Sequence, residues 1–178
     1  VAGYDCKKVR NIARQIVAQV GKLHQQGIIH FDLKPRNVLI DKDDQIVLCD
    51  MDAASKVGSL RKRGEKMGSS GYYSPEVARF LETTTTELVS AVSVDVWSIG
   101  VLLYELCCGK TMFAQDIAND EITEASDFSR LILWFTIPDT VLNNVFMASS
   151  EENQHLSNHA KDLIRWCLHG DPCQRPPS

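Results

Sequence analysis

The chain has 178 residues, which is enough for one domain with a sizeable core. Its hydrophobic content of 44%, charged content of 24% and net charge of −4 are ordinary for a soluble protein. This composition excludes a strongly basic surface of the kind that binds nucleic acid or an anionic membrane. The longest apolar run, residues 94–108, is too short to span a bilayer. We therefore expect neither nucleic acid nor a membrane among the partners of this chain.

Residues 7–26 are predicted to form an amphipathic helix, which Gly27 can end in a left-handed cap. His24 is expected to be a helix-end residue rather than a ligand, because nothing nearby partners it. The apolar side chains of this stretch recur at helical spacing: Val9, Ile12, Ile16, Val20 and Leu23.

Residues 28–40 read IIHFDLKPRNVLI and place three chemically useful side chains between two apolar runs. The carboxylate of Asp32 can accept a proton from an attacking hydroxyl, and Lys34 supplies positive charge for a moving phosphoryl group. The amide oxygen of Asn37 is a hard ligand suited to Mg²⁺. Phosphoryl transfer needs chiefly positioned charge, so the stretch predicts a phosphotransfer site. The alternative is a strand and turn with ordinary surface polar residues.

The next residues are predicted to form a hairpin, with strands at 38–40 and 45–49 and a turn at 41–44. The hairpin would return Asp50 to the side of the preceding loop. Two oxygen ligands at adjacent strand ends are what a nucleotide-bound Mg²⁺ needs. We therefore expect Asn37 and Asp50 to share a metal ion.

Residues 53–67 are predicted to be a polar, basic loop that contains Arg61, Lys62 and Arg63. A solvated run of charge and a substrate-docking segment are both compatible with this composition. The loop leads into residues 68–76, which read GSSGYYSPE. Residues 81–92 follow soon after; they contain four consecutive threonines, and no chemistry can be assigned to them.

Residues 93–109 are apolar nearly all round, which predicts a helix buried in the middle of the domain. Ser93 can cap the start of this helix and Gly109 its end. A buried Asp95 then needs polar partners, because an unpaired charge in a core is costly.

A second amphipathic helix is predicted over residues 160–168, with Ser157 as its cap. His155 and His159 lie four residues apart and could share a metal ion, but no third ligand occurs at a suitable spacing. We expect them to mark an exposed helix start.

The cysteines form no C-x-x-C pair, and several lie in apolar stretches, so reduced core thiols are expected. No secretory signal is visible. Both observations predict an intracellular protein, in the cytoplasm or the nucleus. The six cysteines are Cys6, Cys49, Cys107, Cys108, Cys167 and Cys173.

Taken in order, these motifs resemble the C-terminal lobe of the catalytic domain of eukaryotic protein kinases, of the serine/threonine type. Residues 28–40 resemble the catalytic loop, with Phe31 in place of the usual arginine, and residues 50–52 stand where the family has D-F-G. Three later stretches complete the resemblance: residues 68–76 to G-T-x-x-Y-x-A-P-E, residues 95–100 to D-x-W-S-x-G, and residues 168–176 to L-x-x-D-P-x-x-R-P.

The resemblance implies an α+β, mostly helical fold: a kinase-like C-terminal lobe with a small β-hairpin and without the N-terminal lobe. Residues 1–178 would form a partial kinase domain, from the helix before the catalytic loop to just past D-P-x-x-R-P. It would bind ATP, Mg²⁺ and a protein substrate. We expect the fragment alone to be inactive, because it contains no glycine-rich loop and no nucleotide-anchoring lysine upstream of the first helix.

The resemblance also assigns roles to individual residues. Asp32 would be the catalytic base, with Lys34 beside it in the active site. Asn37 and Asp50 would bind Mg²⁺, and together with Leu39 they would bind the nucleotide. The structural and regulatory residues would be His30 of the catalytic loop, Ser69 as a bridge between Asp32 and Lys34, Asp95 as a brace of the catalytic-loop backbone, and Glu76 paired with Arg175.

Two departures from the family pattern favour an alternative, a pseudokinase-like scaffolding or regulatory domain. Phe31 has no charge to pair with a phosphate on the activation segment, here residues 53–67. Asp52 replaces a glycine, whose backbone freedom a side chain restricts. Small-molecule phosphotransferases share the catalytic loop but not the later motifs. The intact set of Asp32, Lys34, Asn37 and Asp50 favours an active parent enzyme.

The departure at Phe31 also carries an expectation about regulation. In kinases with arginine at this position, charge-assisted hydrogen bonds to a phosphorylated residue order the activation segment. That link cannot form here. We therefore expect activity that does not depend on phosphorylation of this segment and that is set by a regulatory partner or a flanking domain.

Overall fold

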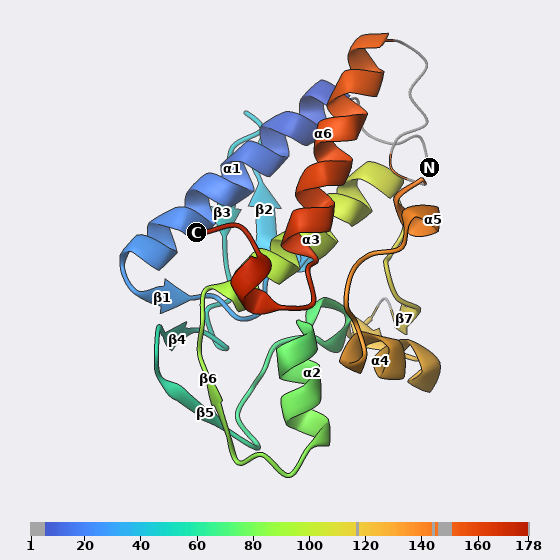
Figure 1. The fold of residues 1–178 in the computed structure, drawn as a ribbon. Helices are drawn as coiled ribbons and strands as arrows, with labels where there is room; N and C mark the ends of the chain where they lie inside the picture. Colours follow the sequence, from blue (N-terminus) through green and yellow to red (C-terminus); the bar gives the residue numbers. More distant parts are fainter. Residues whose placement is uncertain (1–5, 117, 144, 146–150, 178) are drawn as a thin grey trace.

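The long helix α3 (Ser93–Cys108) runs through the middle of the fold, and α1 (Cys6–Gln25) and α6 (Glu151–Cys167) both pack against it (Figure 1). The computed structural model describes residues 6–116, 118–143, 145 and 151–177. The mostly helical fold expected from the sequence is confirmed. The shorter helices are α2 (Pro75–Glu82), α4 (Ala125–Ile132) and α5 (Asp139–Leu142), with 3₁₀ turns η1 (Pro35–Asn37), η2 (Ser70–Tyr72) and η3 (Pro172–Gln174).

The strands described by the structure pair two by two, and each pair is antiparallel. The pair β2 (Val38–Ile40) and β3 (Ile46–Leu48) confirms the predicted hairpin. The other pairs join segments that the sequence did not connect: β1 (Ile28–Ile29) with β4 (Ser55–Lys56), β5 (Leu60–Lys62) with β6 (Glu87–Val89), and β7 (Gln115–Asp116) with β8 (Glu121–Ile122).

The central helix is buried on all sides, as its composition predicts. Trp97 is fully buried, and its ring meets the edge of Trp134 at a centroid distance of 5.5 Å. Gly109 ends the helix in the left-handed conformation, with φ of 66°, so the predicted C-cap is confirmed. The predicted N-cap is wrong by one residue, because Val92 takes that position and Ser93 is already helical.

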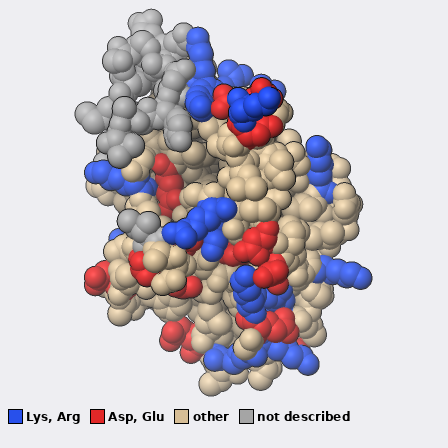
Figure 2. Space-filling view, turned by 180° about the vertical axis from the view of Figure 1, so that it is seen from behind, with Lys and Arg blue, Asp and Glu red and all other residues tan. Residues whose placement is uncertain are grey.

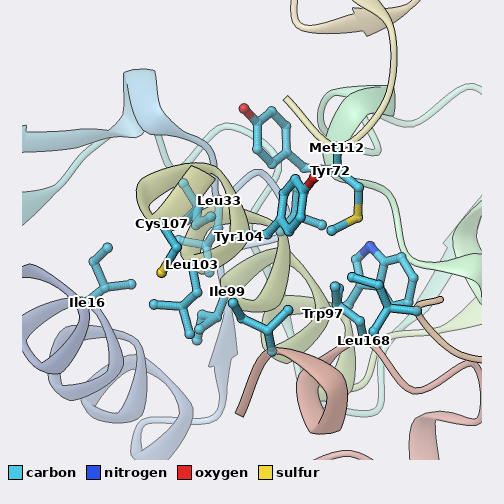
Figure 3. Packing of buried hydrophobic residues seen from close by; sticks show 14 of the residues in the cluster. Ile16, Leu33, Tyr72, Trp97, Ile99, Leu103, Tyr104, Cys107, Met112 and Leu168 are labelled. Carbon is cyan, nitrogen blue, oxygen red and sulfur yellow. The ribbon is translucent and has the colours of Figure 1, made fainter. Parts of the chain in front are cut away.

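The main core lies where α1 and α3 face each other (Figure 3). Side chains of α3, among them Ile99 and Leu103, meet Ile16 of α1, and Leu168 closes the core beyond α6. Val9, Ile12, Ile16 and Val20 are each at most 4% exposed, which confirms the predicted apolar face of α1 at these positions; Leu23, predicted to share it, is half-buried.

A second, smaller cluster lies under residues 53–67, and we call it the minor cluster. It joins the loop after β1 to α2 and to the start of α3. Phe31, 3% exposed, belongs to it. Its buried members are Ile29, Phe31, Ala53, Met67, Val77, Phe80 and Val94.

The last long helix begins earlier than predicted. It starts at Glu151, so Ser157 lies inside it rather than at its cap. The Ser157 hydroxyl instead donates to the carbonyl of Val145 at 3.2 Å and ties the helix to the segment before it. His155 and His159 lie on α6 with ring centroids 4.5 Å apart, and the described residues hold no group of three side chains suited to a metal ion.

Charges of both signs are interspersed on the face shown in Figure 2. None of the helices that the structure describes is long and apolar enough to cross a membrane. The cysteines whose side chains the structure describes form no disulfide, and Cys107 and Cys167 are buried, as expected for core cysteines; the side chain of Cys6 lies outside the described residues.

Gly100 sets the distance between α3 and α6. A Cβ atom at this position would lie 2.7 Å from Cβ of Cys167 and 2.8 Å from Cδ2 of Leu168, both closer than real contacts allow. We predict that Gly100→Ala lowers the free energy of unfolding by about 1–3 kcal/mol, because overpacking outweighs the gain in helix propensity. Urea unfolding of the variant and the wild type measures this difference in the free energy of unfolding.

The matched control is Gly21→Ala on α1, where an added Cβ atom meets nothing within 4 Å. That variant should raise the free energy of unfolding by about 0.5–1 kcal/mol through helix propensity alone. A stabilising effect of Gly100→Ala would show that α3 and α6 are not in tight contact at this point.

Candidate active site

The loop that follows β1 is anchored by the carboxylate of Asp95, which is fully buried at the start of α3. Its two oxygens accept hydrogen bonds from the backbone N–H of His30 at 2.8 Å and of Phe31 at 2.9 Å. The Nε2 atom of His24 lies 2.9 Å from the same carboxylate. These three partners offset the cost of burying a charge.

Phe31 adopts the left-handed conformation, with φ of 68°. A bulky residue rarely takes this conformation, which costs about 1–3 kcal/mol and persists only where the surroundings enforce it. The bond from its N–H to Asp95 and the burial of its ring enforce it here. The turn at Phe31 places the Asp32 carboxylate beside Asn37 and Lys34.

The carboxylate of Asp32 is 2% exposed and lies among hydrogen-bond donors. The side-chain amide of Asn37 donates to the backbone carbonyl of Asp32 at 2.7 Å and lies 3.3 Å from its Oδ2. Lys34 Nζ lies 3.4 Å from the same oxygen. An acid held in this way is fixed in position and can still accept a proton.

Lys34 is the centre of a small polar network. Its ammonium donates to the hydroxyl of Ser69 at 2.7 Å and lies 3.4 Å from Oδ2 of both Asp32 and Asp120. Lys34 therefore stands between Ser69 and Asp32 in this structure. The network joins the loop after β1 to the stretch before η2.

His30 connects this loop to the end of the hairpin. It is fully buried; its Nδ1 accepts from the backbone N–H of Asp32 at 3.4 Å, and its Nε2 lies 3.2 Å from the carbonyl of Cys49. The N–H of Cys49 in turn donates to the carbonyl of Asn37 at 3.0 Å. The hairpin thus returns Asp50 to the neighbourhood of Asn37, as the sequence predicts.

Asn37 and Asp50 fit the requirements of a nucleotide-bound Mg²⁺. The amide nitrogen of Asn37 is engaged with Asp32, so the amide oxygen is the atom that could bind a metal ion. Asp50 is an exposed carboxylate with φ of 62°, and Lys66 Nζ lies 3.8 Å from its Oδ1. Two oxygen ligands, completed by phosphates and water, suit Mg²⁺ better than a full protein cage.

Asp52 does not adopt a positive φ, so the loss of the glycine's backbone freedom causes no strain at this position. Positive φ among the described non-glycine residues occurs at Phe31, Asp44, Asp50 and Asp120, so the left-handed residue of this stretch is Asp50. Asp52 has an ordinary backbone and a side chain that is 79% exposed. A glycine is therefore not required at this position in this structure.

Glu76 and Arg175 form a bidentate pair with N–O distances of 2.7 and 2.8 Å. Arg175 also donates to the carbonyls of Ser93 and His169, each at 2.8 Å, and its guanidinium lies 5.2 Å from the ring centroid of Trp97. The Arg175 side chain is fully buried, and each of its three nitrogens donates at least one hydrogen bond. This pair fixes the start of α2 to α3 and to the end of the chain.

Two polar residues of the site carry no signal in the sequence. Asp120 lies in the turn between β7 and β8, with φ of 59°, and its carboxylate is 3.4 Å from Lys34 and 3.3 Å from Nε of Arg36. His24 has Asp95 as a partner, so the expectation that it lacks one is wrong. Both contacts join residues far apart in the chain, and only the fold brings them together.

The hairpin of β7 and β8 is docked on η2. The carbonyl of Asp120 accepts from Gly71 N–H at 3.0 Å, and Glu121 accepts from Ser70. Beside it, the Tyr72 hydroxyl donates to Glu105 at 2.8 Å. Burial raises the pKa of Glu105 to about 7 and raises the pKa of Tyr72 well above its ordinary value.

The protein kinase domain model matches residues 2–178, which is nearly the whole chain. The chain belongs to the protein kinase family. Calcium/calmodulin-dependent protein kinase cmkA of Emericella nidulans is 32% identical over 176 residues, 97% of this chain and 37% of that protein. The phosphorylase b kinase gamma catalytic chain, liver/testis isoform, of Bos taurus is 31% identical over 169 residues, 95% and 37% of the two chains. Serine/threonine-protein kinase TOUSLED of Arabidopsis thaliana is 33% identical over 178 residues, 96% and 23%.

We predict that Asp95→Ala destabilises this kinase domain by about 3–5 kcal/mol. The substitution leaves the buried N–H groups of His30 and Phe31 unpaired and removes the carboxylate that His24 contacts. Urea unfolding gives the magnitude, and hydrogen exchange at His30 and Phe31 should rise with it. The control is Asp139→Asn, since the Asp139 side chain is 81% exposed and its ion pair with Arg165 is worth at most about 1 kcal/mol. Equal effects of the two substitutions would contradict the anchoring role.

We predict that stability falls with pH through Glu105. Its folded pKa of about 7 exceeds the ordinary 4.5, so the folded state holds this proton more tightly than the unfolded state. The resulting stability is complete below about pH 4.5 and is lost as the pH rises through 7. Glu105→Gln removes this loss, so the variant should gain on the order of 2 kcal/mol relative to the wild type between pH 4.5 and 8.

Urea unfolding of both proteins across this pH range makes the comparison, with Glu82→Gln, at an exposed position, as the matched substitution. A difference between wild type and Glu105→Gln that stays constant with pH would contradict the assignment.

Proposed function

We propose that this chain is the catalytic-loop and substrate-side part of a serine/threonine protein kinase, which transfers the ATP γ-phosphoryl group to hydroxyls of a protein substrate. The observation that carries the proposal is the environment of Asp32: a buried carboxylate held by Asn37 and Lys34, next to the hairpin end that bears Asp50. An acid in this setting accepts the hydroxyl proton of the attacking substrate.

In the proposed mechanism, Asp32 orients the substrate hydroxyl and takes up its proton as the new O–P bond forms and the bond from the γ-phosphorus to the departing ADP breaks. Lys34 holds positive charge beside this oxygen, with its Nζ 3.4 Å from Oδ2 of Asp32. Asn37 and Asp50 would hold Mg²⁺. Bound Mg²⁺·ATP supplies the phosphoryl group and neutralises the charge that develops on it. Leu39, 54% exposed on β2, is proposed to contact the nucleotide base.

Two observations support serine and threonine as the acceptor residues. The Lys34–Ser69 hydrogen bond ties the catalytic loop to the stretch that leads into η2, where a substrate chain would lie. One relative that matches nearly the whole chain is named a serine/threonine-protein kinase.

The chain spans 23–37% of the length of the three relatives described above. We propose that residues 1–178 are a partial kinase domain, from the helix before the catalytic loop to just past D-P-x-x-R-P, and that a nucleotide-binding lobe completes the site in the parent protein. The β2–β3 hairpin supports this, because it leaves the apolar side chains of Leu39, Ile40 and Val47 exposed. The fragment alone would bind ATP weakly and show no turnover.

The second candidate is a pseudokinase-like scaffolding or regulatory domain in the same intracellular setting, the cytoplasm or the nucleus. Phe31 favours it, since it departs from the family's catalytic loop. The coherent placement of Asp32, Lys34, Asn37 and Asp50 favours the enzyme. In either case we propose that a regulatory partner or a flanking domain sets activity, because Phe31 offers no charge to a phosphorylated activation segment.

In the parent protein, Asp32→Asn and Asp50→Asn should each lower kcat for a Ser/Thr peptide by at least about 10²-fold, because one removes the proton acceptor and the other a metal ligand. Asp52→Asn is the matched control: it lies two residues from Asp50 but is 79% exposed, and it should leave kcat within a few-fold of the wild type. Transfer of labelled γ-phosphate measures all three.

ATP affinity measured by calorimetry, together with turnover, separates the enzyme from the scaffold. Micromolar ATP affinity without turnover in the parent protein would favour the scaffold. Turnover that survives Asp32→Asn would contradict the proposed mechanism.

A further inference from the structure

Arg61 is a buried cation inside the activation segment, residues 53–67. The sequence places it in an exposed basic run with Lys62 and Arg63. In the structure Lys62 and Arg63 are exposed, whereas Arg61 is 6% exposed. A guanidinium is buried only where its donors and its charge are matched, so the partners of Arg61 define its role.

The guanidinium joins the two ends of the segment. Its Nη1 donates to the carbonyl of Ala53 at 2.9 Å, and its Nη2 donates to the carbonyl of Lys66. Its Nε lies 3.1 Å from the Glu65 carboxylate, which neutralises its charge. The segment is thereby closed into a loop around one cation.

The same guanidinium joins the segment to the catalytic loop. Its Cζ lies 4.8 Å from the centroid of the Phe31 ring, which is a cation–π contact. The ring is 3% exposed in the minor cluster, where Ala53 and Met67, also from the segment, pack with it. Phe31 is the residue before Asp32, so the cation–π contact of Arg61 lies directly beside the proposed catalytic base.

A strand from residues 81–92 covers the other side of the segment. Strand β6 pairs with β5, with Arg61 opposite Leu88. Backbone bonds extend the pairing: Gly58 N–H to Ser90 O and Ser90 N–H to Ser59 O, each at 2.8 Å. The stretch to which the sequence assigned no chemistry therefore holds the activation segment from outside, while Arg61 holds it from inside.

We propose that Arg61 is a positioning residue that keeps the activation segment ordered against the catalytic loop without phosphorylation. The segment supplies its own cation and the catalytic loop supplies an aromatic receptor at Phe31, so no phosphate is needed to connect them. The proposed role of Arg61 concerns the conformation of the domain. Its test therefore does not depend on the proposed catalytic activity.

Hydrogen exchange followed by mass spectrometry tests the proposal on the unphosphorylated protein. Amides of residues 53–67 should be protected in the wild type. Arg61→Met should speed their exchange about tenfold or more, because the fork to two carbonyls and the ring contact are both lost. Lys62→Met removes the same charge from an exposed neighbour and should change the exchange less than twofold.

A double-mutant cycle isolates the ring contact. Phe31→Leu keeps apolar volume but removes the ring face, and it should speed exchange of the segment roughly fivefold. In the Arg61→Met background the same substitution should have less than a twofold effect. Protection of α3 amides reports whether each variant remains folded; if Arg61→Met loses it, Arg61→Gln, which keeps a hydrogen-bond donor but removes the charge from the ring, replaces it in the cycle.

Unchanged sensitivity to Phe31→Leu in both backgrounds would overturn the coupling. Fast exchange of residues 53–67 in the unphosphorylated wild type, or protection that appears only after phosphorylation of the segment, would overturn the proposal as a whole.

Discussion

The whole site depends on one buried carboxylate. Asp95 accepts the N–H groups of His30 and Phe31, and in doing so it holds Phe31 in a conformation that the residue would otherwise avoid. From this fixed turn, the positions of Asp32 and of its donors follow. Asp95 is itself held by α3, the most completely buried helix described, so the geometry of the active site is tied to the hydrophobic core. Loss of core packing would therefore disturb the position of Asp32 and of its donors.

Buried guanidinium groups provide a second level of organisation. Arg175 gathers Glu76, two backbone carbonyls and the face of Trp97, while Arg61 gathers two carbonyls, Glu65 and the face of Phe31. In each case a planar cation lies on a ring, donates to backbone carbonyls at its edges and has a carboxylate nearby to balance its charge. Arg175 fixes the start of α2 to the central helix α3, and Arg61 fixes the activation segment to the loop after β1.

Local patterns in the sequence predicted the local structure well. The periodicity of Val9 to Val20 predicted the buried face of α1, and alternating apolar and turn residues predicted the β2–β3 hairpin. The predicted caps at Ser93 and Ser157 were wrong, because a serine near a helix start does not by itself indicate whether the chain before it is already helical. Family resemblance supplied candidate site residues that composition could not.

Apart from the pairs that the family resemblance supplied, such as Glu76 with Arg175, contacts between distant segments were beyond reach of the sequence. The partners of Asp120 and His24 and the aromatic partner of Arg61 lie in other elements, so no spacing rule connects them. The pairing of β5 with β6 was equally invisible, and it has a consequence for self-association. A lone strand in an activation segment presents unpaired backbone groups that a second copy could join. Here β6 occupies that edge within the same chain, so exchange of this segment between two copies would first require its own strand to be displaced.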